Sequence, residues 1–181
     1  FPMSSLNLWN NYAVYIEVFV PEGEVDEIKV DTTNGAINID DLTISSIILD
    51  TTNGAISLSD VSATSINVDT TNGAIGGDVS AVNGVFSTTN GAIELTIDAQ
   101  SGSYNLDTTN GSIDLNLPTD SNIGYKINLD TTIGSIDVDL PNITYTTDRT
   151  REKTGETVGY DSKTIQIEID ADTTIGGIEL N

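Results

Sequence analysis

The sequence predicts an all-β fold, a single-domain parallel β-solenoid (β-helix) of about eight coils with roughly 19–23 residues per coil. Two observations predict it. A repeated motif, Asp-Thr-Thr-Asn-Gly-Ala-Ile, begins at Asp31, Asp50 and Asp69, and variants of it begin at Ser87, Asp107, Asp130 and Asp172. Around every copy, apolar residues alternate with polar ones, which is the period of a half-buried strand.

Short strands are therefore expected on both sides of each motif. Apolar pairs precede the motif, as at Ile28 and Val30, and further pairs follow it, as at Ile37 and Ile39. The copies begin about 18 to 23 residues apart except the last, whose distance from its predecessor is close to two periods. We therefore expect one degenerate coil between Leu140 and Asp170. Coils stacked about 4.8 Å apart would form a rod roughly 38 Å long.

A meander of hairpins is the competing arrangement, because Asn-Gly between two strands is a strong hairpin signal. Two copies argue against it, since Ile133 and Ile175 replace the asparagine, and a type I′ turn would force a positive φ on these β-branched residues. Counting alternate residues from Val30 places Asn34 on the core side. The sequence thus predicts a stacked ladder of asparagines in the core, formed by Asn34, Asn53, Asn72, Asn90 and Asn110.

Residues 1–27 lack the motif and are expected to form a separate N-terminal strand segment, before a solenoid spanning 28–181. The strand is apolar on both faces. It could cap the first coil, or it could be donated to a neighbouring subunit, which would bury both faces. The residues that would make this contact are Trp9, Val14, Ile16 and Val18.

The C-terminal end of the repeat is expected to be an open edge, because the chain stops at Asn181 directly after a motif. Ile178 and Leu180 would then be free to pair with another copy, and a head-to-tail contact of this kind generates filaments. The irregular segment 141–163 carries Arg149 and Arg151. It is expected to be a solvated hairpin or loop, or alternatively a basic tab that docks on an acidic wall of another subunit.

Composition narrows the range of functions. Lys plus Arg is 6 and Asp plus Glu is 28, a formal net charge of −22, which repels nucleic acid and anionic membranes. Histidine and cysteine are absent, so the commonest general base, the thiolate metal ligands and disulfides are excluded. No stretch has the length of a membrane helix. Because the chain begins at Phe1, we expect a mature, secreted form, found outside the cell or at its surface.

The aspartates of the motif are expected to form an outward column. The candidates are Asp31, Asp50, Asp69, Asp107, Asp130 and Asp172. A solvated carboxylate face is one interpretation, and weak Ca²⁺ binding is the other; no further cofactor is expected. The second threonines of the motif form another outward column. Ice binding is an alternative interpretation of this column. Asn142 lies in an Asn-Ile-Thr sequon and is the expected glycan acceptor, whereas the sequon at Asn110 would be buried in the ladder.

The recurring Thr-Thr-Asn-Gly-Ala-Ile, with apolar pairs on each side, resembles the adhesin-type (Toastrack-like) β-solenoid domains of bacterial and archaeal surface proteins, over about residues 28 to 181. The resemblance implies a solenoid fold and a place on the cell surface, and it brings no catalytic residues.

Together with the repeat, this resemblance predicts an extracellular structural or adhesive protein that is not an enzyme. We expect a subunit of a surface filament, with copies of itself as partners and surface or matrix polymers as further ones. A monomeric adhesin or ligand-binding module is the alternative. A polysaccharide-active enzyme is disfavoured, because the repeat gives every carboxylate the same environment, whereas paired-acid chemistry needs one to differ.

Overall fold

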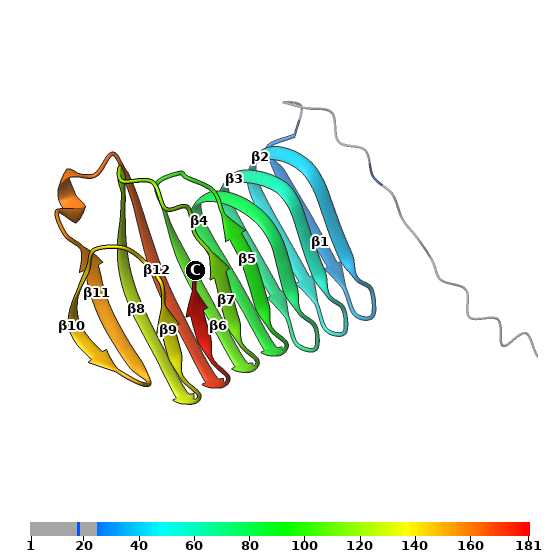
Figure 1. The fold of residues 1–181 in the computed structure, drawn as a ribbon. Helices are drawn as coiled ribbons and strands as arrows, with labels where there is room; N and C mark the ends of the chain where they lie inside the picture. Colours follow the sequence, from blue (N-terminus) through cyan, green and yellow to red (C-terminus); the bar gives the residue numbers. More distant parts are fainter. Residues whose placement is uncertain (1–17, 19–24) are drawn as a thin grey trace, which may run out of the picture.

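The chain folds into a curled, mostly parallel β-sheet, seen in a computed structural model that describes Val18 and residues 25–181 (Figure 1). This confirms the predicted all-β class. The strands are β1 Glu27–Thr32, β2 Ile37–Thr51, β3 Ile56–Thr70, β4 Ile75–Asn90, β5 Ile93–Ile97, β6 Gly102–Asn110, β7 Ile113–Asn116, β8 Ile123–Ile133, β9 Ile136–Val138, β10 Ile143–Arg149, β11 Glu152–Thr157, β12 Ile165–Ile175 and β13 Ile178–Leu180. A short 3₁₀-helix, η1, covers Tyr160–Ser162.

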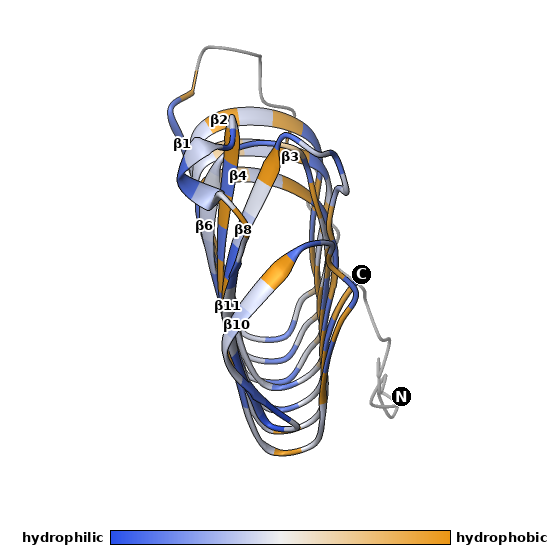
Figure 2. Cartoon of the chain, turned by 60° about the vertical axis from the view of Figure 1, so that its left-hand side comes forward, coloured by the Kyte–Doolittle hydropathy of each residue, from blue (hydrophilic) through white to orange (hydrophobic). Residues whose placement is uncertain are grey.

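Each copy of the motif forms a corner between two faces of the solenoid. The strand before the motif lies on the first face, where the order is β1, β2, β3, β4, β6, β12, β8. The strand after the motif lies on the second face, where the order is β2, β3, β4, β5, β7, β13, β9. β2, β3 and β4 each bend over an arch and contribute to both faces. Viewed closer to the stacking axis, successive turns superimpose, with polar corners at one edge (Figure 2).

The core consists of columns of equivalent side chains, one from each turn. The residue that ends the motif is isoleucine in all seven copies, and these side chains stack in register on the second face: Ile37, Ile56, Ile75, Ile93, Ile113, Ile178 and Ile136. All seven are buried. Because identical β-branched side chains repeat at the strand spacing, each packs on its copies above and below.

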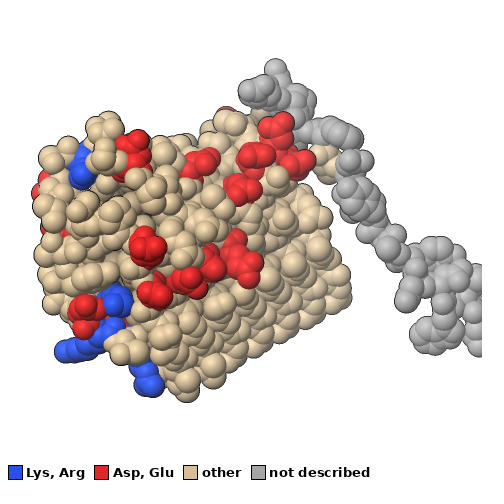
Figure 3. Space-filling model, in the orientation of Figure 1, with Lys and Arg blue, Asp and Glu red and all other residues tan. Residues whose placement is uncertain are grey.

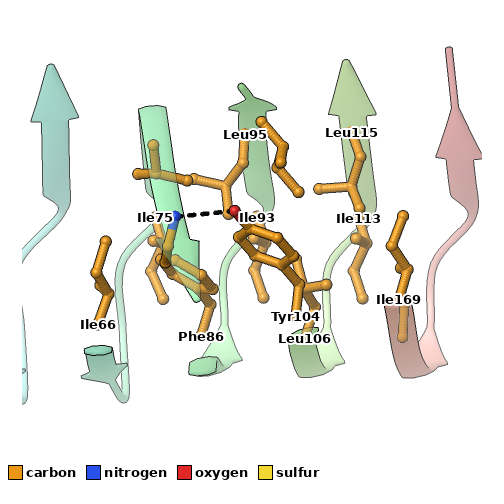
Figure 4. Close-up of a cluster of buried hydrophobic side chains, with 14 of the residues drawn as sticks. Ile66, Ile75, Phe86, Ile93, Leu95, Tyr104, Leu106, Ile113, Leu115 and Ile169 are labelled. Carbon is orange, nitrogen blue, oxygen red and sulfur yellow. Dashed lines mark hydrogen bonds between the residues drawn. The ribbon is translucent and has the colours of Figure 1, made fainter. Parts of the chain in front are cut away.

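The middle of the core departs from this aliphatic pattern. Phe86 and Tyr104 are fully buried among Leu106, Ile66 and Ile169 (Figure 4). Gly84 makes room for them, because a Cβ at this position would lie 2.8 Å from the Phe86 ring and 2.8 Å from the Tyr104 ring. The Tyr104 hydroxyl accepts a hydrogen bond from the Ala81 backbone N–H at 3.0 Å, so its polar atom is satisfied inside the core.

The last copy of the repeat lies inside the stack. β12 pairs in parallel with β6 on one side and β8 on the other, and β13 lies between β7 and β9. In Figure 1 the orange-red and red strands of the C-terminus stand between green and yellow neighbours. The expected open edge at the C-terminus is therefore wrong, since Ile178 is 1% and Leu180 0% exposed.

An antiparallel hairpin ends the first face beyond β8. β11 pairs antiparallel with β8, and β10 pairs antiparallel with β11. The degenerate coil expected between Leu140 and Asp170 is thus this hairpin, followed by η1 and the start of β12. Residues 25–181 form seven parallel turns, one for each motif copy, where the sequence predicted about eight coils. Tyr160 of η1 is buried, and Gln166 donates to its carbonyl at 3.1 Å, which anchors the crossing to β12.

Candidate functional surfaces

Two ladders of polar side chains run along the Thr-Thr-Asn-Gly corner. The inner ladder consists of the first threonine of each motif. Thr51, Thr70, Thr88, Thr108, Thr131 and Thr173 are buried, and the hydroxyl of each donates to the motif glycine carbonyl of a neighbouring turn at 2.8–3.1 Å. These bonds satisfy the buried hydroxyl and the glycine carbonyl, which accepts no backbone hydrogen bond among the described residues.

The asparagines form the outer ladder, at the surface. Asn53 donates from Nδ2 to Asn34 Oδ1 at 2.9 Å, and the chain of bonds continues through Asn72, Asn90 and Asn110 at 2.9–3.0 Å. All five residues are exposed, so their predicted place in the core is wrong. The reason is local: the chain turns outward at the corner, so the alternation of buried and exposed residues breaks down there, even in β4 and β6, whose last residues are Asn90 and Asn110.

The motif aspartates stand in an outward row along the first face. Register places them in the order Asp31, Asp50, Asp69, Ser87, Asp107, Asp172 and Asp130, so the row is broken once by a serine. Partial burial, followed by the charges of Asp130, Asp107 and Asp170, raises the pKa of Asp172 above its ordinary value.

The row of motif aspartates does not by itself form a coordination site for Ca²⁺. Neighbouring carboxylates about 4.8 Å apart point outward side by side rather than toward one point. Across the part of the chain that the structure describes, no group of three acidic, histidine or cysteine side chains is arranged to hold a metal ion.

A second group of acids, which the motif did not reveal, lies on the other face. Glu94, Asp114, Glu179 and Asp137 occupy one row on β5, β7, β13 and β9. A shallow groove lined by Asp114, Glu179 and Asp137 runs along it. Figure 3 shows acidic side chains spread over this side, with lysine and arginine gathered at the β10–β11 end. Only the inserted position of β13 brings Glu179 between Asp114 and Asp137, so the linear sequence could not show this row.

The basic residues of segment 141–163 belong to the hairpin and its crossing. Arg149 ends β10 and its Nη1 lies 2.6 Å from Glu152 Oε2, while Arg151 is exposed in the turn. Lys153 approaches Asp148 and lies over the Tyr145 ring, 5.1 Å from its centre. The hairpin is thus part of the sheet, rather than a loop projecting from a coil.

The other predicted positions are the N-terminal contact residues and the two glycosylation sequons. Trp9, Val14 and Ile16 lie outside the described residues, and Val18 is 74% exposed. Asn142 is exposed, with a φ of 60°, in the turn before β10. Its side chain can be reached by solvent, and its glycosylation stays a prediction. Asn110 is also exposed, contrary to the expected burial of its sequon.

No helix in the described part of the chain is long and apolar enough to span a membrane. The family model described as Toastrack DUF4097 matches residues 2–83 and 22–176. No curated protein matches the chain. A solved structure titled "putative cell adhesion protein", from Clostridium sporogenes ATCC 15579, is 12% identical, covers 91% of this chain and 96% of its own, and superposes with a TM-score of 0.48.

Proposed function

Because the chain belongs to the Toastrack family DUF4097, we propose that it is an adhesive and structural module of a cell surface, not an enzyme, and that copies join end to end into a filament. The observation that carries the proposal is the shape of the stack. Seven in-register turns form a rod with one polar corner and two acidic faces, and its two ends differ.

Several features support a structural role. The interior is filled with aliphatic columns and three aromatic side chains, Phe86, Tyr104 and Tyr125, and the polar atoms of the corner hydrogen-bond to the corner of the neighbouring turn. The acidic side chains occur in rows of like neighbours, and even Asp172, whose pKa is raised, stands in such a row and is exposed, rather than in the distinct environment that paired-acid chemistry needs. The exposed threonines and asparagines of the corner offer hydrogen-bond donors and acceptors to a surface or matrix polymer.

End-to-end joining cannot use the edge that the sequence suggested at Ile178 and Leu180, because both residues are internal. Electron microscopy and light scattering of the purified chain over a concentration series test the proposal. We expect rods that lengthen as concentration rises. Single particles about one rod long at every concentration would contradict the filament.

A monomeric adhesive module is the second candidate. It is favoured by one specific observation: the β10–β11 hairpin finishes the first face with an antiparallel pair instead of another coil. Terminal elements of this kind protect repeat proteins from association. The same microscopy separates the two candidates, and binding of the chain to immobilised cell-surface polysaccharide would support the adhesive role of a monomer.

A further inference from the structure

The first end of the rod is the outer edge of β1. β1 pairs with β2 on one side, and its other edge has no partner among residues 25–181. Ile28 and Val30 are only partly buried there, whereas the equivalent Ile47 and Leu49 of the next turn are fully buried. An edge with unpaired backbone groups and half-covered apolar side chains is a template for another strand.

The second end of the rod is the outer edge of β10. In the described part of the chain β10 pairs only with β11. Two antiparallel steps, from β8 to β11 and from β11 to β10, return the chain to the direction of β8. Since β8 and β1 belong to the same parallel face, β10 and β1 run the same way. A second copy displaced along the axis would therefore present its β1 to β10 as one more parallel strand.

Charge along one row favours this contact. The row of motif aspartates continues from Asp130 through Glu152 of β11 to Arg149 of β10. Arg149 is the row's single cation within the described residues, and its side chain is 73% exposed. If a second copy followed, its Asp31 would take the next place in the row. Arg149 would then lie between Glu152 of its own copy and Asp31 of the second copy. Its positive charge would separate the two carboxylates at the junction.

We propose that copies of this chain join through β10 of one and β1 of the next, with Arg149 beside Asp31 of the neighbouring copy. This contact rests on the proposed end-to-end assembly and names its strands and its register. It is a heterologous contact, which repeats without closing.

The contact is one-sided. On the first face the rod ends at β10, whereas on the second face it ends at β9, which is two strands earlier. A single new strand pair buries less than the roughly 1,000 Å² that marks a stable interface, so the junction forms at high concentration and dissociates on dilution. The exposed pair of Arg149 and Asp31 of the neighbouring copy then contributes mainly to the choice of register.

The absence of cysteine makes a disulfide trap the direct test. Glu27 and Thr144 occupy a second outward row, in the same register as Asp31 and Arg149. In the double variant Glu27→Cys, Thr144→Cys, the two thiols lie at opposite ends of one copy but face each other across the proposed junction. Oxidation at high concentration is expected to give a ladder of covalent oligomers on a non-reducing gel.

Charge variants in this trap background test the register. Arg149→Glu is expected to lower the yield of the ladder about fivefold, because an exposed ion pair becomes a repulsion. Adding Asp31→Arg should restore the yield. Arg151→Glu is the matched control: it reverses another exposed charge, outside the row, and is expected to leave the ladder unchanged. Circular dichroism and melting of each variant confirm that the fold is intact.

The outcomes are distinct. Filaments of the unmodified chain without a ladder would overturn this contact and leave the end-to-end function standing. Neither filaments nor a ladder would overturn both. Dimers formed by the single variant Glu27→Cys, with no higher oligomers from the double variant, would show a head-to-head pairing of β1 edges and overturn the contact.

Discussion

At the scale of the residue, the two threonines of each motif have opposite roles. Thr108 is 1% exposed and donates to the Gly91 carbonyl at 2.9 Å, whereas Thr109, the next residue, is exposed. Side chains in a strand alternate between its two faces, so Thr108 lies inside and Thr109 outside. This alternation breaks down at Asn110, which is exposed as well. The stacking of asparagines could be predicted from the repeat, but their exposure could not, because it depends on how the chain turns at the corner, where the alternation fails even inside β4 and β6.

Replacing the buried threonine is expected to destabilise the protein, and replacing its neighbour is not. Thr108→Val removes the hydroxyl and leaves the Gly91 carbonyl without that donor, which should lower the free energy of unfolding by about 1 to 2 kcal/mol. Thr109→Val should change it by less than about 0.5 kcal/mol. Denaturant unfolding of both variants measures the difference, and equal losses would show that the inner ladder has no special role.

Asp172 shows the electrostatic cost of a partly buried carboxylate that also lies beside other acids. Its pKa is raised by partial burial and by the charges of Asp130 and Asp107. The folded state therefore binds the proton more tightly than the unfolded state, where the pKa is near 3.8. This contribution to stability is fully present below pH 3.8 and is lost as the pH rises through the folded pKa.

Removing this charge should therefore stabilise the protein at neutral pH. Asp172→Asn is expected to raise the melting temperature at pH 7, and the gain should shrink as the pH falls to about 3. Asp40→Asn removes an equal charge outside the row and serves as the control. A gain for Asp172→Asn that is independent of pH, or no larger than that of the control, would contradict the explanation.

At the scale of the element, the order of strands in space differs from their order in the chain. Period and alternation were enough to predict the parallel strands, their apolar columns and the corner at each motif. They could not show that β12 and β13 return to a place between earlier turns, because every turn presents nearly the same edge. One signal did exist: only the copies containing Ile133 and Ile175 carry isoleucine in place of asparagine, and these two lie side by side.

The position of β13 predicts a large effect for a residue that is close to the end of the chain. Ile178 packs between Ile113 and Ile136, so Ile178→Ala should lower the free energy of unfolding by about 2–5 kcal/mol, as for any buried isoleucine. Ile39→Ala, at the half-buried end of the stack, should cost clearly less. Chemical denaturation measures both, and a small loss for Ile178→Ala would place β13 at an exposed edge.

At the scale of the whole molecule, stacking identical units explains both the regular core and the acidic surface. One motif repeated in register gives each column a single residue type, so an aspartate in the motif becomes a row and contributes to a net charge of −22. The hairpin alters one end of this row by adding Arg149. The sequence marked segment 141–163 as basic and irregular, but its place at the end of the first face follows from the insertion of the last turn.

Cysteine pairs test the insertion of the last turn directly. The double variant Asp107→Cys, Asp172→Cys joins adjacent strands about 4.8 Å apart, a distance that a disulfide spans, whereas Asp107→Cys, Asp130→Cys joins strands about 9.6 Å apart, which it cannot. Mass spectrometry after mild oxidation of the dilute chain should show an internal disulfide only in the first variant. A disulfide only in the second would mean that the turns stack in chain order and that the C-terminal edge is free.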